Sequence, residues 1–234
     1  MIVRFVPFWI AATLLSAGPA GATLLMVSNP GFEDPILTEP ASTDDDVPGW
    51  IGTGGVLGAS NFGVFNPPSS FFPAEAPEGE NVAYIQDGQI AQGLADVLTE
   101  GTYELSVLAG QSLVDSLSPF RVQLWAGPTL LAEETTPMAV AGEFVDVTVQ
   151  YVAGAADPAL GSALEIVLVD DGIPGNSADE PYFDSVSLDF VPTPEPAQAL
   201  LLLIGAACLT VGRRVLLGLT GARRLASPTR SSGQ

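Results

Sequence analysis

The stretch Phe144-Val145-Asp146-Val147-Thr148-Val149-Gln150-Tyr151 decides the fold class of this chain. Apolar and polar side chains alternate along it, which is typical of a strand with one face on a core and the other in water. Similar alternation occurs at 102–108, 120–125, 164–169 and 183–190. Because Gly, Pro and Asp turns separate these stretches, we predict a β-sandwich of antiparallel sheets over residues 23–190.

One further pair of strands is predicted at 82–86 and 89–92. Asp87-Gly88 lies between these stretches, and this dipeptide is a common two-residue turn in β-hairpins. The pattern therefore predicts a hairpin centred on Asp87-Gly88.

The charge of the chain is strongly acidic. The sequence has 27 Asp and Glu against 7 Arg, with neither Lys nor His, and its net charge is −20. Between 23 and 190 there are 26 acidic residues and one basic residue, Arg121, for a net charge of −25. Catalysis that depends on His, Schiff-base chemistry on Lys and His-based metal sites are excluded. Nucleic acid is an unfavourable partner, whereas oxygen ligands suit Ca²⁺ or sugars.

The N-terminus has the three parts of a secretory signal peptide. Arg4 precedes an apolar run at 5–17, and Ala20-Gly21-Ala22 is a small-residue cleavage site. We therefore expect residues 1–22 to be removed after Ala22 and the domain at 23–190 to be exported. The single cysteine, Cys208, lies outside that domain, so we expect no disulfide within it.

The C-terminal segment has a different composition. A Pro-rich hinge at 191–196 precedes an uncharged apolar run and then Arg213 and Arg214. We expect a transmembrane helix with its arginines at 197–214 and a disordered cytoplasmic tail at 215–234.

This order of features resembles the PEP-CTERM sorting signal of Gram-negative bacteria. The tripeptide falls on Pro194, Glu195 and Pro196, followed by the apolar run and by Arg213 and Arg214. The resemblance implies a membrane processing enzyme, an exosortase, as partner. It also implies transient membrane anchoring through the helix, followed by release to the cell surface or extracellular matrix.

A second resemblance concerns the domain at 23–190. Its ordered landmarks are Asn29-Pro30-Gly31-Phe32-Glu33, Pro48-Gly49-Trp50, Glu78-Gly79-Glu80-Asn81-Val82-Ala83-Tyr84, Gly101-Thr102-Tyr103-Glu104-Leu105 and Tyr182-Phe183-Asp184-Ser185-Val186. They look like those of the galactose-binding-like superfamily, which includes many carbohydrate-binding modules. The resemblance implies a jelly-roll β-sandwich and a structural Ca²⁺ held by Glu33 and Asp184. The residues alone leave an alternative, in which Glu33 caps a turn and Asp184 is a solvated strand residue.

The remaining acidic clusters are interpreted as solvated loops. They are Asp44-Asp45-Asp46 and the group of Asp170, Asp171, Asp179 and Glu180, which lacks the spacing of an EF-hand. We expect Arg121 to pair with an acid on a neighbouring strand.

Aromatic residues are candidates for a sugar platform. The Gly/Pro/Ser/Asn-rich loop at 62–72 is one possible ligand surface, whereas Trp50 and Tyr84 are expected to pack in the core, and the ligand-binding residues are left unassigned.

The functional expectation from the sequence is non-catalytic, because no motif assigns catalytic roles to named residues. We expect an exported surface or matrix protein that binds carbohydrate or exopolysaccharide. The alternative is a purely structural matrix component without a specific ligand.

Overall fold

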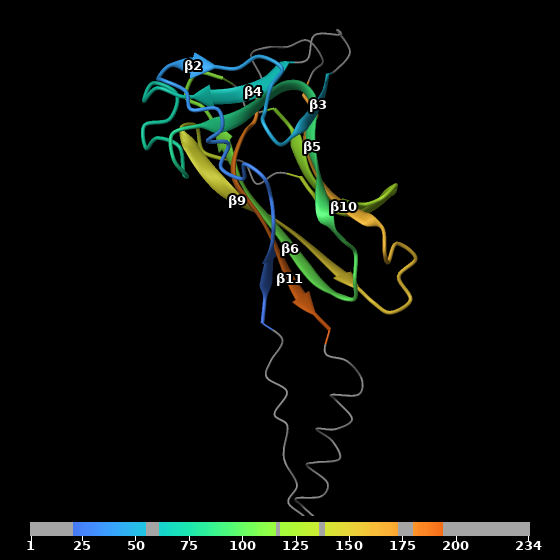
Figure 1. Ribbon diagram of the computed structural model, residues 1–234. Helices are drawn as coiled ribbons and strands as arrows, with labels where there is room; N and C mark the ends of the chain where they lie inside the picture. Colours follow the sequence, from blue (N-terminus) through green and yellow to red (C-terminus); the bar gives the residue numbers. More distant parts are fainter. Residues whose placement is uncertain (1–20, 55–60, 116–117, 136–138, 173–179, 194–234) are drawn as a thin grey trace, which may run out of the picture. The chain divides into compact units, whose positions relative to one another are not determined.

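The computed structural model describes residues 21–54, 61–115, 118–135, 139–172 and 180–193. Within these ranges the regular structure consists of strands, and no helix occurs (Figure 1). The strands are β1 (Thr23–Leu25), β2 (Ala41–Ser42), β3 (Ile51–Gly54), β4 (Asn61–Asn66), β5 (Val82–Val97), β6 (Gly101–Gln111), β7 (Phe120–Ala126), β8 (Thr129–Glu134), β9 (Glu143–Ala153), β10 (Ala163–Asp170) and β11 (Tyr182–Pro192).

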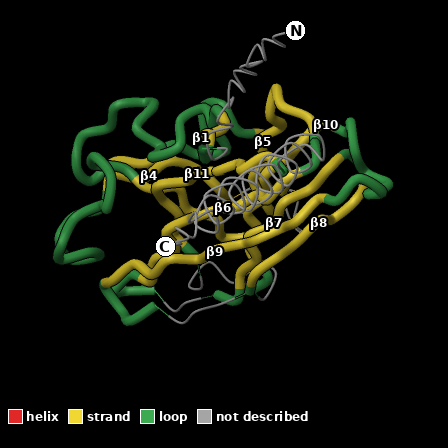
Figure 2. The backbone as a smooth tube through the Cα atoms, turned by 90° about the horizontal axis from the view of Figure 1, so that it is seen from below, coloured by secondary structure: helices red, strands yellow, loops and turns green. Residues whose placement is uncertain are grey.

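The strands form two sheets that share β5. Sheet A contains β1, β2, β4, β6, β9, β11 and the first half of β5, and sheet B contains β3, β7, β8, β10 and the second half. Every strand pair is antiparallel, and β11, β6 and β9 lie side by side in both views (Figure 1, Figure 2). The predicted all-β, antiparallel class is confirmed.

The predicted hairpin at Asp87-Gly88 is wrong. β5 continues through this dipeptide, pairing with β4 up to Asp87 and with β10 from Gly88 onward. Gly88 has a φ of 102°, a conformation that glycine adopts without a steric cost. The dipeptide therefore redirects one long strand from sheet A into sheet B instead of reversing the chain.

The main core lies between the two sheets. Phe120 of β7 and Phe183 of β11 meet across it in a T-shaped pair with ring centroids 5.5 Å apart. β6 buries every second side chain over its first half, including Tyr103, Leu105 and Val107, as the alternating pattern predicts. Trp50 belongs to this core, as expected.

A second apolar cluster lies on the other face of sheet A. Successive strand residues point to opposite faces, so Tyr182 points away from the core that its neighbour Phe183 enters. The segment at 67–77 covers Tyr182, and Phe72 is fully buried against it with ring centroids 5.1 Å apart. Phe65, Phe71 and Phe144 complete this group of rings, which we call the aromatic layer. The side chains of β11 are therefore covered on both faces at its N-terminal end.

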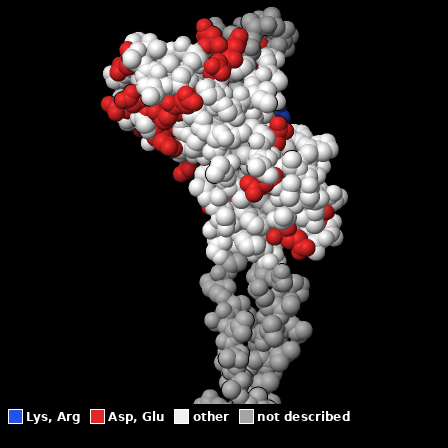
Figure 3. Space-filling model, in the orientation of Figure 1, with Lys and Arg blue, Asp and Glu red and all other residues white. Residues whose placement is uncertain are grey.

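The surface of the described unit is acidic, with separate groups of Asp and Glu on the face shown in Figure 3. Residues 1–20 of the expected signal peptide lie outside the described residues, as does the expected sorting segment with Pro194, Glu195, Pro196, Arg213 and Arg214. Among the described residues, none belongs to a helix long and apolar enough to cross a membrane.

Gly52→Ala is expected to destabilise the fold. A Cβ at Gly52 would lie 1.8 Å from Cζ of Phe62, a buried ring that cannot easily move. We expect a loss of about 1–3 kcal/mol in the free energy of unfolding, measured by urea denaturation. Gly93→Ala is the matched strand control, because a Cβ at Gly93 would meet no other part of the chain within 4 Å. Equal stability of the two variants would contradict this packing.

Candidate functional site

Glu33 and Asp184 lie on either side of one loop, at Glu78–Asn81. The Glu33 carboxylate accepts the N–H groups of Glu80 and Asn81, at 3.0 and 2.8 Å. Asp184 accepts the N–H groups of Glu78 and Ser185, at 2.8 and 2.6 Å. Ser185 has a φ of 50° and lies in a bulge of β11, where the register with β6 shifts. The structure thus brings the two predicted metal ligands to the same loop.

The chemistry around this loop suits a cation. Burial, with the nearby Glu78 and Glu33 carboxylates, raises the pKa of Asp184 to about 7 despite its two N–H bonds. Asn81 donates from Nδ2 to the carbonyls of Phe32 and Pro35, but its buried Oδ1 has no partner among the described residues. Carboxylate and amide oxygens at this loop are therefore available to a metal ion, and oxygen ligands of this kind are the ones that Ca²⁺ prefers. No three acids of the described ranges are placed together as metal ligands, so loop carbonyls or water would have to contribute.

A second polar group lies at the N-terminal end of β11, at the edge of the aromatic layer. The Tyr182 hydroxyl contacts Asp115 Oδ2 at 2.8 Å and also contacts Glu180 Oε1. Gln86 donates to Glu180 Oε2 at 2.5 Å, and Ser112 donates to Asp115 Oδ2 at 2.8 Å. Because β11 begins two residues after Glu180, the start of the strand places the Glu180 carboxyl group at the hydroxyl of Tyr182.

The two contacts of the Tyr182 hydroxyl limit how protons can be shared among Tyr182, Glu180 and Asp115. A phenol has one proton, so the Tyr182 hydroxyl can donate to one carboxylate only. The second contact is favourable when the other carboxyl group is protonated and donates to the phenol oxygen. Glu180 is the more buried of the two acids, and burial raises its pKa, with Asp115 and Asp170 adding to the effect. Burial therefore favours a proton on Glu180, while the hydrogen bonds from Tyr182 and Gln86 act on its pKa in the opposite direction.

Two more carboxyl groups lie close by, where sheets A and B meet. Asp170, at the end of β10, accepts hydrogen bonds from Ser118 and from the N–H of Gly172. Burial raises the pKa of Asp170, and the negative charges of Asp87 and Asp171 raise it further. Asp87 is only 7% exposed, and its Oδ2 has no hydrogen-bond partner among the described residues. Several carboxyl groups thus lie near the end of β10, where Asp171 is paired with Arg121.

The aromatic layer borders these acids directly. Phe65 lies edge-on to Phe71, with ring centroids 5.2 Å apart, and Phe72 packs on Phe144 at 4.6 Å. Phe65, Phe71 and Phe144 remain partly exposed. An acid donor at the edge of several rings can bind an apolar, aromatic molecule and transfer a proton to it.

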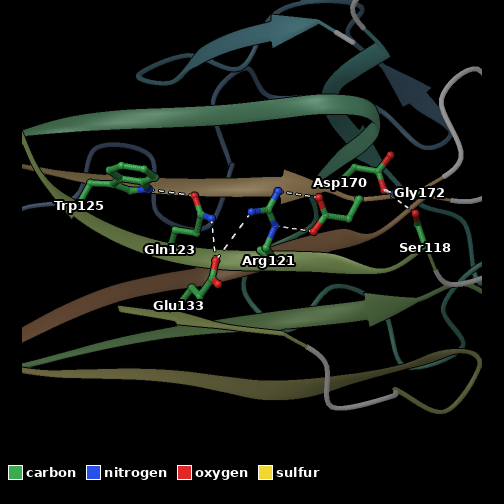
Figure 4. A network of polar contacts seen from close by, with 8 residues as sticks. Ser118, Arg121, Gln123, Trp125, Glu133, Asp170 and Gly172 are labelled. Atoms are coloured by element: carbon green, nitrogen blue, oxygen red, sulfur yellow. Dashed lines mark hydrogen bonds and ion pairs between the residues drawn. The ribbon is translucent and has the colours of Figure 1, made fainter. Parts of the chain in front are cut away.

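A polar network along sheet B includes Arg121, and the same view shows Asp170 with its partners Ser118 and Gly172 close to it (Figure 4). Arg121 makes two hydrogen bonds to Asp171, at 2.5 and 2.7 Å, and lies 3.8 Å from Glu133. Gln123 bridges Glu133 to the indole nitrogen of Trp125. The expected pairing of Arg121 with nearby acids is thus observed. Since these side chains are about one-third exposed, they contribute little to stability.

Several sequence expectations change in this region. Phe62 is a buried strand residue and not part of an exposed sugar platform, and Tyr84 packs under the aromatic layer. Glu180 and Asp170 were expected in a solvated loop, but Glu180 is only 7% exposed. The segment at 67–77, which is distant in sequence from Glu180, covers the neighbouring Tyr182. The burial of Glu180 could therefore not be predicted from the charges of the residues around it in the sequence. No motif or spacing in the sequence singled out Asp115 as a site residue.

Comparison with known proteins identifies the family of the described domain. The model of the HpiC1-like family, described as HpiC1 cyclase, matches residues 23–189. A Stig cyclase, Fisc, from Fischerella sp. TAU is 32% identical and was crystallised with (3Z)-3-(1-methyl-2-pyrrolidinylidene)-3H-indole. The match covers 74% of this chain and 100% of that one, with a TM-score of 0.66. A cyclase from the same organism, in complex with 4-(1H-indol-3-yl)butan-2-one, is 31% identical over 74% and 100% of the two chains, with a TM-score of 0.65. Among curated proteins, no match is found.

These matches correct the functional expectations. The interpretation as a PEP-CTERM protein with a carbohydrate-binding-type domain is wrong, and so are the non-catalytic role and the proposed exosortase and exopolysaccharide partners. The non-catalytic role was inferred because no catalytic motif is visible, but carboxyl and phenol groups can act as acids without one. Over residues 23–189, this chain belongs to the HpiC1-like cyclase family.

Proposed function

We propose that this protein catalyses the acid-promoted cyclisation of a small molecule that contains an indole ring. The observation that carries the proposal is the Glu180–Tyr182–Asp115 group at the edge of the aromatic layer. Membership of a cyclase family and the indole ligands of two related cyclases support it.

In this mechanism, Glu180 is the general acid. Its proton is held on a carboxyl group that the phenol of Tyr182 and the amide of Gln86 orient. Transfer of that proton to a π bond of the substrate would create a cation that a second π bond attacks, closing a ring. The carboxylate of Glu180 then takes a proton back from the ring-closed cation, so the reaction is an isomerisation and the enzyme is regenerated.

The other residues of the site have supporting roles. Asp115 accepts hydrogen bonds from Ser112 and Tyr182, and a carboxylate held in this position would stabilise the cation formed after protonation. The rings of the aromatic layer would bind the indole and exclude water, which would otherwise capture the cation.

We also propose a structural Ca²⁺ at the Glu78–Asn81 loop. Glu33, Asp184 and Oδ1 of Asn81 are the side-chain groups that would hold the ion, and it would offset their negative charge. The finer fold assignment, a jelly-roll β-sandwich, is supported by the passage of the chain from sheet B to sheet A between β10 and β11. The signal-peptide features of residues 1–22 support export of the domain.

Glu180→Gln is expected to abolish most of the activity. The amide keeps the shape of the side chain but cannot donate a carboxylic proton, and general acids typically contribute 10²–10⁴-fold to a rate. We expect a loss of about 100-fold or more in kcat. The assay would follow conversion of indoles with unsaturated C3 side chains into cyclic isomers of the same mass. Glu100→Gln, at an exposed position, is the control, and a Glu180→Gln variant as active as this control would refute the proposed acid.

The same substitution tests the protonation state of Glu180 through stability. The native pKa is raised above the ordinary value of 4.5, so between these two values the native state holds more protons than the unfolded state. Stability should therefore fall as pH rises through this window. Glu180→Gln should lose less stability than the wild type over the same pH range. Parallel curves of unfolding free energy against pH would show that Glu180 is ionised in the native state.

Removal of Ca²⁺ is expected to lower the melting temperature of the full chain. An ion that binds only the native state stabilises it in proportion to the logarithm of its concentration. Glu33→Gln should remove most of this Ca²⁺ dependence, whereas Glu39→Gln, at an exposed position, should retain it. Identical melting temperatures in Ca²⁺ and in chelator would exclude the site.

A further inference from the structure

The Ser112 side chain has all of its hydrogen-bonding groups in use. Its hydroxyl oxygen accepts the backbone N–H groups of Val114 and Asp115, at 3.2 and 2.8 Å, and its proton is donated to Oδ2 of Asp115 at 2.8 Å. A serine hydroxyl has two acceptor sites and one donor, and Ser112 is only 1% exposed. Because a backbone N–H can only donate, these two groups leave the hydroxyl as a donor toward the carboxyl group.

The turn that contains Ser112 is tied to its surroundings by the backbone. The N–H of Leu113 donates to the carbonyl of Phe71 in the aromatic layer, at 3.0 Å. Just before the turn, the carbonyl of Gln111 accepts the N–H of Gly142, at 2.7 Å. Since the backbone is held at both places, the N–H groups that the Ser112 hydroxyl accepts have fixed directions.

The Ser112 hydroxyl influences the next hydrogen bonds of the group. Its bond to Oδ2 of Asp115 is stronger when this oxygen carries no proton, because hydrogen bonds to an ionised acceptor are about twice as strong as neutral ones. The same Oδ2 lies 2.8 Å from the Tyr182 hydroxyl, so the single phenol proton is directed to Asp115. The contact of the phenol oxygen with Oε1 of Glu180 is then made by a proton of Glu180.

We propose that Ser112 is a positioning residue that makes Glu180, and not Asp115, the proton donor of the site. This inference rests on the proposed function, because it names the residue that selects the acid. Ser112 acts through two other side chains: it keeps Asp115 as an acceptor, Tyr182 donates to Asp115, and Glu180 donates to Tyr182.

The titratable groups that face Glu180 in the described ranges come from four elements. They are Tyr182 of β11, Asp115 of the turn after β6, Asp170 at the end of β10 and Tyr84 of β5. The charges of the two aspartates favour the protonated form of Glu180. Removing the serine hydroxyl alters none of these groups, so its effect on the acid must pass through the hydrogen bonds.

Ser112→Ala tests this assignment through the pH profile of kcat/KM. Without the serine hydroxyl, the phenol proton of Tyr182 can turn to Glu180, which stabilises the Glu180 carboxylate and lowers its pKa. Because the acid must be protonated to react, activity falls as pH rises through this pKa. We expect the descending limb of the profile to move to lower pH by about 0.5–1 pH unit, the effect of one neutral hydrogen bond.

The substrate for this profile is 3-(4-methylpent-3-enyl)-1H-indole. Protonation of its alkene gives a tertiary cation, and attack by C2 of the indole followed by loss of a proton gives a tetrahydrocarbazole of the same mass. The reaction needs no co-reactant, since the proton that the acid gives to the alkene is returned from the ring.

Further variants distinguish positioning from a purely structural role. Ser112→Thr keeps a hydroxyl and should retain the wild-type limb, and so should Ser106→Ala, which makes the same change within β6. In a Tyr182→Phe background, Ser112→Ala should cause no additional shift, because the phenol that transmits its effect is missing. If Ser112→Ala does not fold, Ser112→Cys replaces it, since a thiol is a weak donor.

The dependence of stability on pH gives the same test without a substrate. Glu180 has a native pKa raised above 4.5, so the wild type loses stability as pH rises from 4.5 to that value. A lower native pKa in Ser112→Ala would narrow this window, and the variant should lose less stability over it. The difference should vanish when both proteins also carry Glu180→Gln.

The outcomes separate the inference from the proposed function. Ser112→Ala with the pH limb and the stability curve of the wild type would overturn the inference and leave the cyclisation intact. Absence of conversion by the wild type would overturn the proposed function, and the stability curves alone would then decide the role of Ser112.

Discussion

The passage of β5 from one sheet to the other is the constraint on which the rest of the structure depends. A single strand of 16 residues, Val82–Val97, pairs with β4 and β11 in sheet A and then with β3 and β10 in sheet B. Gly88 allows the change of direction because glycine alone adopts its φ without strain. The residues just before it, Gln86 and Asp87, are thereby placed at the junction of the two sheets, and Gln86 donates to Glu180, which precedes β11.

The same junction explains how an acidic domain can carry acid catalysis without histidine. Acidic residues also gather in groups on the surface, as on the face shown in Figure 3. At the junction, burial and mutual repulsion favour protonation of Glu180, and the single proton of the Tyr182 hydroxyl requires a protonated partner. Low solvation thus raises the pKa of Glu180, which favours the role of proton donor that we propose for it. The 67–77 segment contributes to this by covering the ring of Tyr182 with Phe72.

The strands could be predicted from the sequence because their alternation is local. The stretch at 144–151 lies within β9, and its alternation matches the pairing with β6. The carboxylates of Glu33 and Asp184 both accept N–H groups of the Glu78–Asn81 loop, and the metal-binding role expected of them stays a prediction. Asp87-Gly88 could not be interpreted correctly, because the same dipeptide serves a hairpin turn and a bend within a strand. Burial of Glu180 depends on segments distant in sequence, so the acid of the site was not predictable. Composition excluded enzymes that need His or Lys, but it could not exclude one that uses carboxyl and phenol groups.

The central claim is that an indole binds on the aromatic layer with Glu180 as its acid. A crystal structure of the protein in complex with 4-(1H-indol-3-yl)butan-2-one, a ligand of a related cyclase, tests this most directly. We predict that the indole ring lies against Phe65, Phe71 or Phe144, with its side chain within hydrogen-bonding reach of the Glu180 carboxyl group. An indole bound elsewhere, for example beside Trp125 on the outer face of sheet B, would contradict the account.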